Sequence, residues 1–192
     1  MQRPNEKKRR KITDTAAKLF ATRPFHKVRL DDVAAAAQVG KGTLYVYFKS
    51  KDDLYRSLVY DGLSRLVDQL NAETAADIPP DAALESIVRG LVRFAFDHPN
   101  LYELGRLLGP LKGKSRLAMK REELVAILER TLRRGMDDAI WSDPRPELTA
   151  VFIPGFVRSA ILYGPAGLDE AALSRHILHV VRHGLGGGRG VA

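Results

Sequence analysis

The stretch VRLDDVAAAAQVGKGTLYVYFKSKDD, from Val28 to Asp53, decides how this chain is interpreted. Beginning at Leu30, its first half carries apolar residues at positions i, i+3, i+4 and i+7, which predicts a short helix. Gln38-Val39-Gly40 is a tight connection, and a second short helix is expected to begin at about Lys41. Two short helices joined by three or four residues that include a glycine have the geometry of a helix-turn-helix.

The second of these helices carries side chains suited to a DNA groove. Leu44 and Phe48 share one face, which can pack inward. Thr and Tyr hydroxyls bond phosphates, and apolar edges contact thymine methyl groups. Exposed tyrosines and a threonine between lysines would be unusual on a purely structural helix. The residues in question, crowded into nine positions, are Lys41, Thr43, Tyr45, Tyr47 and Lys49.

The positive charge of the chain is concentrated in the same region. The 192 residues have a net charge of +8, and residues 1–51 hold 13 Lys and Arg against 4 Asp and Glu. The rest of the chain holds 18 against 19 and is nearly neutral. A basic head on a neutral body is expected of a module that neutralises phosphates. Charge alone is equally compatible with a solubilising basic tail, and the helix-turn-helix pattern favours the first interpretation.

Composition excludes several other classes of protein. The chain has no cysteine, which excludes disulfides and thiolate metal sites and favours a reducing cytoplasm. The polar, basic stretch from Met1 to Lys11 does not resemble a secretory signal. No apolar run approaches the roughly 18 residues of a membrane-spanning helix. Because the chain also lacks a Gly-x-Ser-x-Gly elbow, a phosphate-binding glycine loop and an HExxH motif, we expect no enzyme and no cofactor.

The remainder of the chain also has helical periodicity, and no stretch alternates apolar and polar residues as a half-buried strand does. The fold class is therefore all-α, with about nine helices. Helices are expected to start at the N-caps Ser50, Asp81, Ser115 and Asp169, a brief helix to end near Leu108, and the eighth helix to kink at Pro154.

The run from Gly40 to Lys51 resembles the recognition-helix signature of the TetR family of one-component regulators. The preceding Asp32–Ala37 resembles the second helix of that family, and Ala17-Lys18-Leu19-Phe20 is similar to the first. The resemblance covers roughly residues 6–66, and beyond residue 70 it is only architectural. It implies a homodimer, a palindromic operator in double-stranded DNA, and repression that is relieved by a small molecule bound in the body.

The resemblance also implies which side chains contact DNA. The hydroxyl-bearing residues of the recognition helix would touch DNA, and the lysines after it would hold backbone phosphates. Arg29 departs from the family, which usually has Thr or Ser there; arginine can bind phosphate but cannot accept the capping bond. Gly40 stands where Ser is common, and glycine is an acceptable N-cap. The expected DNA-binding residues are Arg29, Lys41, Gly42, Thr43, Tyr45, Tyr47, Lys49 and Lys51.

The resemblance divides the chain into a DNA-binding head, residues 6–66 with the helix-turn-helix at about 29–48, and a regulatory and dimerisation body, residues 67–192. The resemblance implies that the last two helices form the dimer interface, and the residue types agree, because Gly155 and Ser159 are small, lie four apart and would let two backbones approach. The alternative is that these helices pack only within one protomer. The expected interface residues are Phe152, Gly155, Phe156, Ser159, Ile177 and Val181.

An effector pocket is expected between the fifth and eighth helices, lined by apolar and aromatic side chains with arginines as polar contacts. The same residues would otherwise form ordinary core. The candidates are Phe94, Tyr102, Arg106, Met119, Leu128, Phe156 and Arg158.

A stripe of three histidines, His176, His179 and His183, could in principle bind zinc or nickel. No carboxylate completes the set and two arginines lie nearby, so we expect a solvated face and no metal site. Two other functions stay open beside a regulated repressor. One is an architectural DNA-binding protein without an effector, and the other is a small-molecule-binding module whose head has lost DNA binding.

Overall fold

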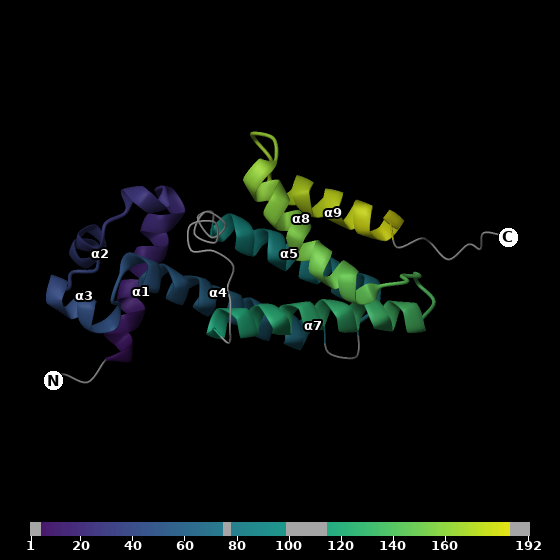
Figure 1. Ribbon diagram of the computed structural model, residues 1–192, viewed down its shortest axis with the longest axis horizontal. Coiled ribbons are helices and arrows are strands. Elements are labelled where there is room, and N and C mark those ends of the chain that lie inside the picture. Colours follow the sequence, from purple (N-terminus) through teal and green to yellow (C-terminus); the bar gives the residue numbers. More distant parts are fainter. Residues whose placement is uncertain (1–4, 75–77, 99–114, 185–192) are drawn as a thin grey trace.

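The structure is a computed structural model that describes residues 5–74, 78–98 and 115–184 (Figure 1). These residues form eight α-helices and one 3₁₀ helix, and no strand occurs among them, which confirms the all-α prediction. The brief helix expected to end near Leu108 lies outside the described residues. The elements are α1 (Glu6–Thr22), η1 (Phe25–Lys27), α2 (Leu30–Ala36), α3 (Lys41–Tyr47), α4 (Lys51–Glu73), α5 (Pro80–Asp97), α7 (Arg116–Asp137), α8 (Pro146–Tyr163) and α9 (Glu170–Gly184).

Side-chain caps fix the start of three long helices where the sequence predicted them. Ser50, Ser115 and Asp169 each accept the backbone N–H of the residue three positions later, at 3.1, 3.2 and 2.7 Å. Each cap satisfies one of the donors that the first turn of a helix leaves without an intrahelical partner.

The prediction that Asp81 caps α5 is wrong. The helix begins two residues earlier than that cap requires, with Pro80 in the first position and Pro79 as the N-cap. Proline suits that position because the N–H it lacks would have no intrahelical partner. The Asp81 carboxylate instead accepts two hydrogen bonds of 2.9 Å from Arg182, and so joins the start of α5 to the end of α9.

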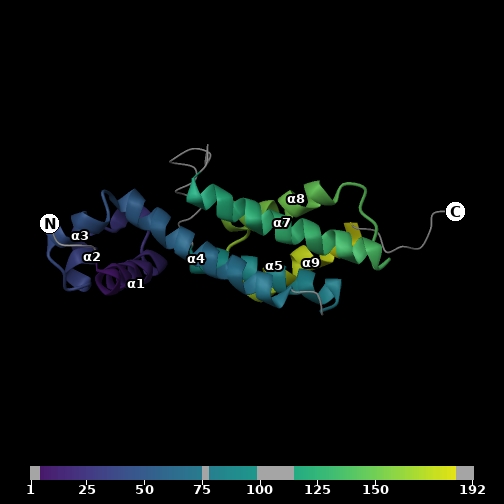
Figure 2. The ribbon, with the colours of Figure 1, turned by 90° about the horizontal axis from the view of Figure 1, so that it is seen from below.

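Two hydrophobic clusters stabilise the fold, and α4 belongs to both. The head cluster combines α1, η1, α2 and α3 with the first half of α4, as far as Val59. The body cluster begins at Leu63 of the same helix and includes α5, α7, α8 and α9. In two views at right angles, α4 runs from the head into the body (Figures 1 and 2). Any displacement of this helix therefore involves both clusters.

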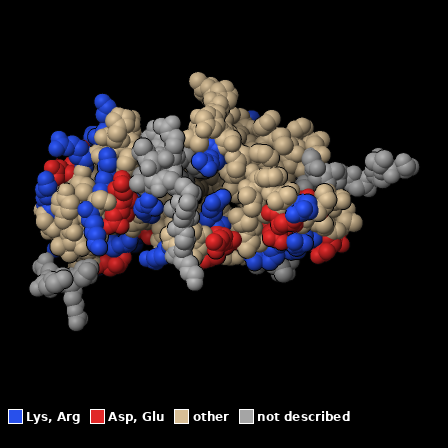
Figure 3. All heavy atoms as spheres, in the orientation of Figure 1, with Lys and Arg blue, Asp and Glu red and all other residues tan. Residues whose placement is uncertain are grey.

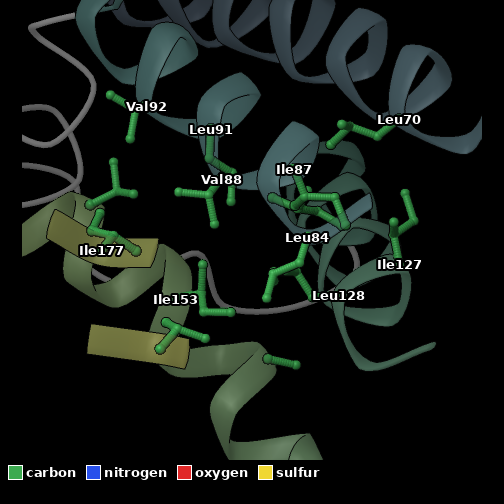
Figure 4. Close-up of a cluster of buried hydrophobic side chains, with 14 of the residues drawn as sticks. Leu70, Leu84, Ile87, Val88, Leu91, Val92, Ile127, Leu128, Ile153 and Ile177 are labelled. Carbon is green, nitrogen blue, oxygen red and sulfur yellow. The ribbon is translucent and has the colours of Figure 1, made fainter. Parts of the chain in front are cut away.

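The centre of the body is the apolar stripe of α5. Leu84, Ile87, Val88 and Leu91 recur at helical spacing and are buried. Figure 4 shows these side chains among residues of α7, α8 and α9. Full burial of one such side chain contributes roughly 1.5–3 kcal/mol, so this stripe is the main attachment of the surrounding helices. Within the described ranges, no helix has the length and apolarity to cross a membrane.

Candidate nucleic-acid interface

The turn between α2 and α3 is four residues long, from Ala37 to Gly40. Its second residue, Gln38, has φ 54°, in the left-handed region that residues with a side chain seldom adopt. The Val39 N–H donates to the Ala34 carbonyl oxygen at 3.0 Å and closes the turn. This compact connection sets α3 at a fixed angle to α2, as a helix-turn-helix requires.

Helix α3 has one buried and one exposed face. Leu44 and Phe48 are buried in the head cluster, which confirms their predicted packing role. The outward face includes Tyr45, which is 46% exposed, and Gly42, where a Cβ would meet no atom within 4 Å. Lys41 and Lys49, at either end of the helix, are also exposed, and Thr43 is half-buried. The structure thus presents most of the predicted DNA-binding residues of α3 to solvent.

Val46 is a residue that sequence reasoning missed. It is 61% exposed, the most exposed of the large apolar side chains of the head. It lies next to Tyr45 on the outward face, where an apolar side chain suits a thymine methyl group. The signal was present in the sequence, because Val46 does not share the spacing of Leu44 and Phe48.

The hydroxyl of Tyr47 is already engaged within the head. It accepts the Asn5 N–H at 2.8 Å and donates to the Asn5 carbonyl oxygen at 3.3 Å. The side chain is half-buried, so it connects the end of α3 to the start of α1. Any contact of Tyr47 with DNA would therefore use the edge of its ring.

Two of the predicted DNA-binding lysines, Lys51 and Lys41, also have partners within the head. Lys51 Nζ donates to the Phe25 carbonyl oxygen at 2.8 Å and lies 4.3 Å from the centre of the Phe25 ring. Lys41 Nζ lies 3.0 Å from a carboxylate oxygen of Asp31. An ammonium group has three hydrogens, so Lys51 retains donors for a phosphate. The exposed Lys41–Asp31 pair contributes only about 0–1 kcal/mol and can exchange for a phosphate.

Arg29 occupies the N-cap position of α2, and its side chain makes no capping bond. The Asp32 carboxylate accepts the Arg29 N–H at 3.1 Å, and the Asp32 N–H in turn donates to the Arg29 carbonyl oxygen at 3.1 Å. The Arg29 side chain is exposed and free of that task. Figure 3 shows many blue Lys and Arg atoms on the head, at the left of the view, among red and tan ones.

Arg9, which the sequence analysis did not single out, locks α1 to α4. Its guanidinium donates to the Ser57 hydroxyl, lies 3.5 Å from Asp61, and sits 5.8 Å from the centre of the Phe48 ring. These contacts join α1 and α4 to Phe48, the residue that ends α3. The sequence signal is its position three residues before buried Ile12, on the inward face of α1.

The outward face of α8 is apolar. Phe152 is 53% exposed and Phe156 39%, with Gly155 and Ser159 exposed between and beside them, while the opposite face is buried. Over α8 and α9, in the upper right of Figure 3, few charged atoms are visible. These four residues are free for the predicted dimer interface, which stays a prediction.

Two other predicted interface residues are corrected by the structure. Ile177 and Val181 are 2% and 4% exposed, within the body cluster. The single apolar stripe of α9 is used in packing against α5 and α8, so these side chains cannot meet a second protomer.

The predicted pocket residues do not converge on one site in the described part of the chain. Leu128 is fully buried in the body cluster, whereas Met119, Phe156 and Arg158 face solvent. In the described part of the chain α7 and α8 turn other residues inward, so these last three side chains point away from the core, and their pocket role stays a prediction. Phe94 is half-buried and packs against both clusters. Tyr102 and Arg106 lie outside the described residues.

His98 lies at the junction of the two clusters, directly after α5. Its Nδ1 is 2.9 Å from the Phe94 carbonyl oxygen, which can only accept, so Nδ1 carries the hydrogen. On the side of α4, a Cβ at Gly62 would lie 2.9 Å from the imidazole. Burial lowers the pKa of His98 below its ordinary value, and Arg65 acts in the same direction, against the Phe94 bond and Asp97.

The histidine stripe of α9 is exposed, as expected. His183 Nδ1 donates to the His179 carbonyl oxygen at 2.7 Å, and the two rings lie 3.9 Å apart. Among the residues that the structure describes, no group of three or more histidine or carboxylate side chains is placed to hold a metal ion.

Comparison with known proteins gives one family and several relatives. Residues 12–58 match the model of the family described as "Bacterial regulatory proteins, tetR family". The Fatty acid metabolism regulator protein of Bacillus subtilis is 29% identical over 62 residues, which are 32% of this chain and 32% of that protein. That match thus spans about a third of the relative's length.

Two further comparisons extend over most of the chain. The HTH-type transcriptional repressor SCO4008 of Streptomyces coelicolor is 26% identical over 180 residues, which cover 87% of this chain and 90% of that protein. The crystal structure of AibR in complex with isovaleryl coenzyme A and operator DNA has a TM-score of 0.69 and 17% identity, covering 90% of this chain and 97% of that one. At that identity the structural likeness concerns the fold.

Proposed function

We propose that this chain, whose residues 12–58 match the model of the TetR family of bacterial regulatory proteins, is a sequence-specific DNA-binding transcriptional regulator, a repressor that a small-molecule effector releases. The observation that carries the proposal is the outward face of α3, where Tyr45 and Val46 are exposed between Lys41 and Lys49. The family match over residues 12–58 includes this helix, and SCO4008 is a repressor by name.

In the proposed complex, α3 enters the major groove of DNA. Its aromatic, hydroxyl and apolar side chains meet base edges and thymine methyl groups, and the surrounding basic groups neutralise phosphates. Backbone contacts hold the register, whereas base contacts supply the sequence preference. The base-reading residues are Gly42, Thr43, Tyr45, Val46 and the ring edge of Tyr47, and the phosphate-binding residues are Arg29, Lys41, Lys49 and Lys51.

We further propose that two protomers associate through the outward face of α8 and bind a palindromic operator in the cytoplasm. Contiguous exposed apolar patches are uncommon on monomeric proteins and mark interaction sites. Phe152 and Phe156 would be the aromatic anchors, and Gly155 would permit close approach. A two-fold dimer sets its half-sites about one helical turn, roughly 34 Å, apart or a multiple of that.

We propose that residues 6–66 form the DNA-binding head and residues 67–192 the regulatory body. Helix α4 then links the DNA-binding surface to the effector site. Since α4 packs in both clusters, a ligand that favours one position of α4 in the body also favours one position of the head. Such coupling is typically about 1–3 kcal/mol. AibR was crystallised with isovaleryl coenzyme A, so acyl-coenzyme A thioesters are the first effectors to test.

The proposal is tested by selecting bound sequences from random duplex DNA, followed by titration of the winner against Tyr45→Ala. We expect an enriched palindrome, and loss of specific binding in the variant with an unchanged circular dichroism spectrum, because Tyr45 is an exposed side chain. Ile140→Ala, an exposed apolar residue of the body, is the control and should bind as the wild type does.

Two outcomes would contradict this proposal. Undiminished operator affinity in Tyr45→Ala would show that α3 does not recognise the bases of the operator. Salt-dependent binding without any enriched sequence would instead favour the architectural DNA-binding protein.

A further inference from the structure

We propose that the first two turns of α1 carry a second phosphate-binding surface, formed by Lys7, Lys8 and Lys11, which continues the DNA contact of the helix-turn-helix. The inference rests on the proposed function and adds three side chains to its DNA-contacting set. Its partner is the sugar–phosphate backbone of double-stranded DNA.

The first observation is that the start of α1 is fastened to the end of α3. Asn5 N–H donates to the Tyr47 hydroxyl at 2.8 Å, and Asn5 Oδ1 accepts the N–H groups of Lys7 and Lys8 at 2.9 and 3.3 Å. The residue that caps α1 is therefore held by the helix that the proposal places in the groove. The lysines that follow the cap lie beside that helix.

The second observation is the direction that these lysines take around α1. On the side of α4, Arg9 is engaged with Ser57 and Asp61. On the other side, Lys11 Nζ lies 3.5 Å from the Gln38 side-chain oxygen in the α2–α3 turn. Residues three and four positions apart share one face of a helix. Lys8 and Lys7, three and four positions before Lys11, therefore lie on the same flank of α1 as Lys11, next to the α2–α3 turn. All three are exposed.

The third observation is that these charges are uncompensated. Arg10, on the other flank, pairs with Asp14 at 3.8 Å, whereas no carboxylate within the described residues lies within ion-pair distance of Lys7, Lys8 or Lys11. Like charges three and four apart repel, and cations are unfavourable in the first turn of a helix. The arrangement lowers the stability of α1 in isolation and suits a polyanion laid along this flank.

The test compares Lys7→Gln plus Lys11→Gln with a control of equal charge loss, Arg65→Gln plus Arg121→Gln, two exposed arginines of α4 and α7. Dissociation constants for the selected operator are measured across a salt series. Each lost phosphate contact reduces the log–log salt slope by about 0.9, so a dimer that loses four contacts should show a slope smaller by about 3 to 4. The selected sequence should not change, because phosphate contacts carry no sequence information.

The control should retain the wild-type slope within about 0.5, well under the change for one lost contact. Thermal unfolding gives a second readout: the Lys7/Lys11 variant should melt at or above the wild-type temperature, which excludes misfolding as the cause of weak binding. An unchanged slope, or an equal change in both variants, would overturn the inference and leave the proposed function intact. Wild-type protein that binds no DNA would overturn the proposed function itself and the inference with it.

Discussion

Gly135 is a position where a single methyl group decides the packing of the body. The Trp141 ring lies so close that a Cβ at Gly135 would stand 2.0 Å from one ring carbon and 2.2 Å from another. The ring is buried, and its Nε1 donates to the Leu132 carbonyl oxygen at 2.9 Å. The glycine is therefore required by a side chain on the connection after α7.

We expect Gly135→Ala to lower the free energy of unfolding by about 2–3 kcal/mol, because overpacking displaces the indole and breaks its hydrogen bond. Urea unfolding followed by the fluorescence of Trp141, the one tryptophan of the chain, measures the effect. Gly42→Ala is the matched control, since nothing surrounds that position, and it should be neutral or stabilising by up to about 1 kcal/mol. Equal stability of Gly135→Ala and the wild type would show that the ring moves aside at no cost.

Single residues also show the limit of what the sequence predicts at the site. The types of side chain on α3 and the inward roles of Leu44 and Phe48 follow from local spacing. The partners of Tyr47 and Lys51 do not, because Asn5 and Phe25 are 42 and 26 residues away along the chain. Contacts of that kind depend on how α1, η1 and α3 meet, which no local pattern encodes.

At the scale of helices, α4 and the end of α5 meet at His98. The buried ring disfavours the charged form, so the pKa of His98 in the folded state lies below its ordinary value of 6.5. Below about pH 6.5 this ring is therefore protonated to a greater extent in the unfolded chain than in the folded chain. The free energy of unfolding should therefore fall as the pH falls through this range, and His98 should contribute nothing above about pH 7.5.

His98→Asn tests this, because an amide nitrogen can replace Nδ1 as the donor to Phe94. The free energy of unfolding of the wild type, relative to the variant, should decrease from pH 7.5 to pH 5.5 by no more than about 1.4 kcal/mol per pH unit, the limit for one proton. His26→Asn, at an exposed position of η1, is the control and should follow the wild type. Parallel pH profiles for the wild type and His98→Asn would contradict the assignment.

The sequence predicted the helices better than their inward faces. Three predicted caps are confirmed because a hydroxyl or carboxylate three residues before a free N–H is a local signal. Helix α8 is apolar on nearly all sides, so periodicity could not choose between the stripe of Ile153 and that of Phe152. Helix α9 has one apolar stripe, which the core uses, and the interface prediction for Ile177 and Val181 failed for that reason.

At the scale of the whole molecule, the exposed face of α8 determines the proposed assembly. Phe152 is 53% exposed in the protomer, so an acidic substitution there leaves the body cluster intact. In a two-fold interface the same residue occurs twice near the axis, so Phe152→Glu would bury two unpaired carboxylates. We expect this variant to be a folded monomer at concentrations where the wild type is a dimer.

Sedimentation equilibrium measures the oligomeric state of Phe152→Glu and of a control, Met119→Glu. Met119 lies on α7 and has the same 53% exposure, so the control reports any general effect of added surface charge. Only Phe152→Glu should dissociate, and its affinity for the full palindrome should fall by at least about 100-fold, because each half-site then binds alone. A Phe152→Glu protein that stays dimeric would place the two-fold axis away from α8. A monomer that still binds the palindrome at full strength would show that one copy of α3 with its surrounding lysines is sufficient for recognition. The two-fold symmetry of the operator would then not be explained by a dimer of this chain.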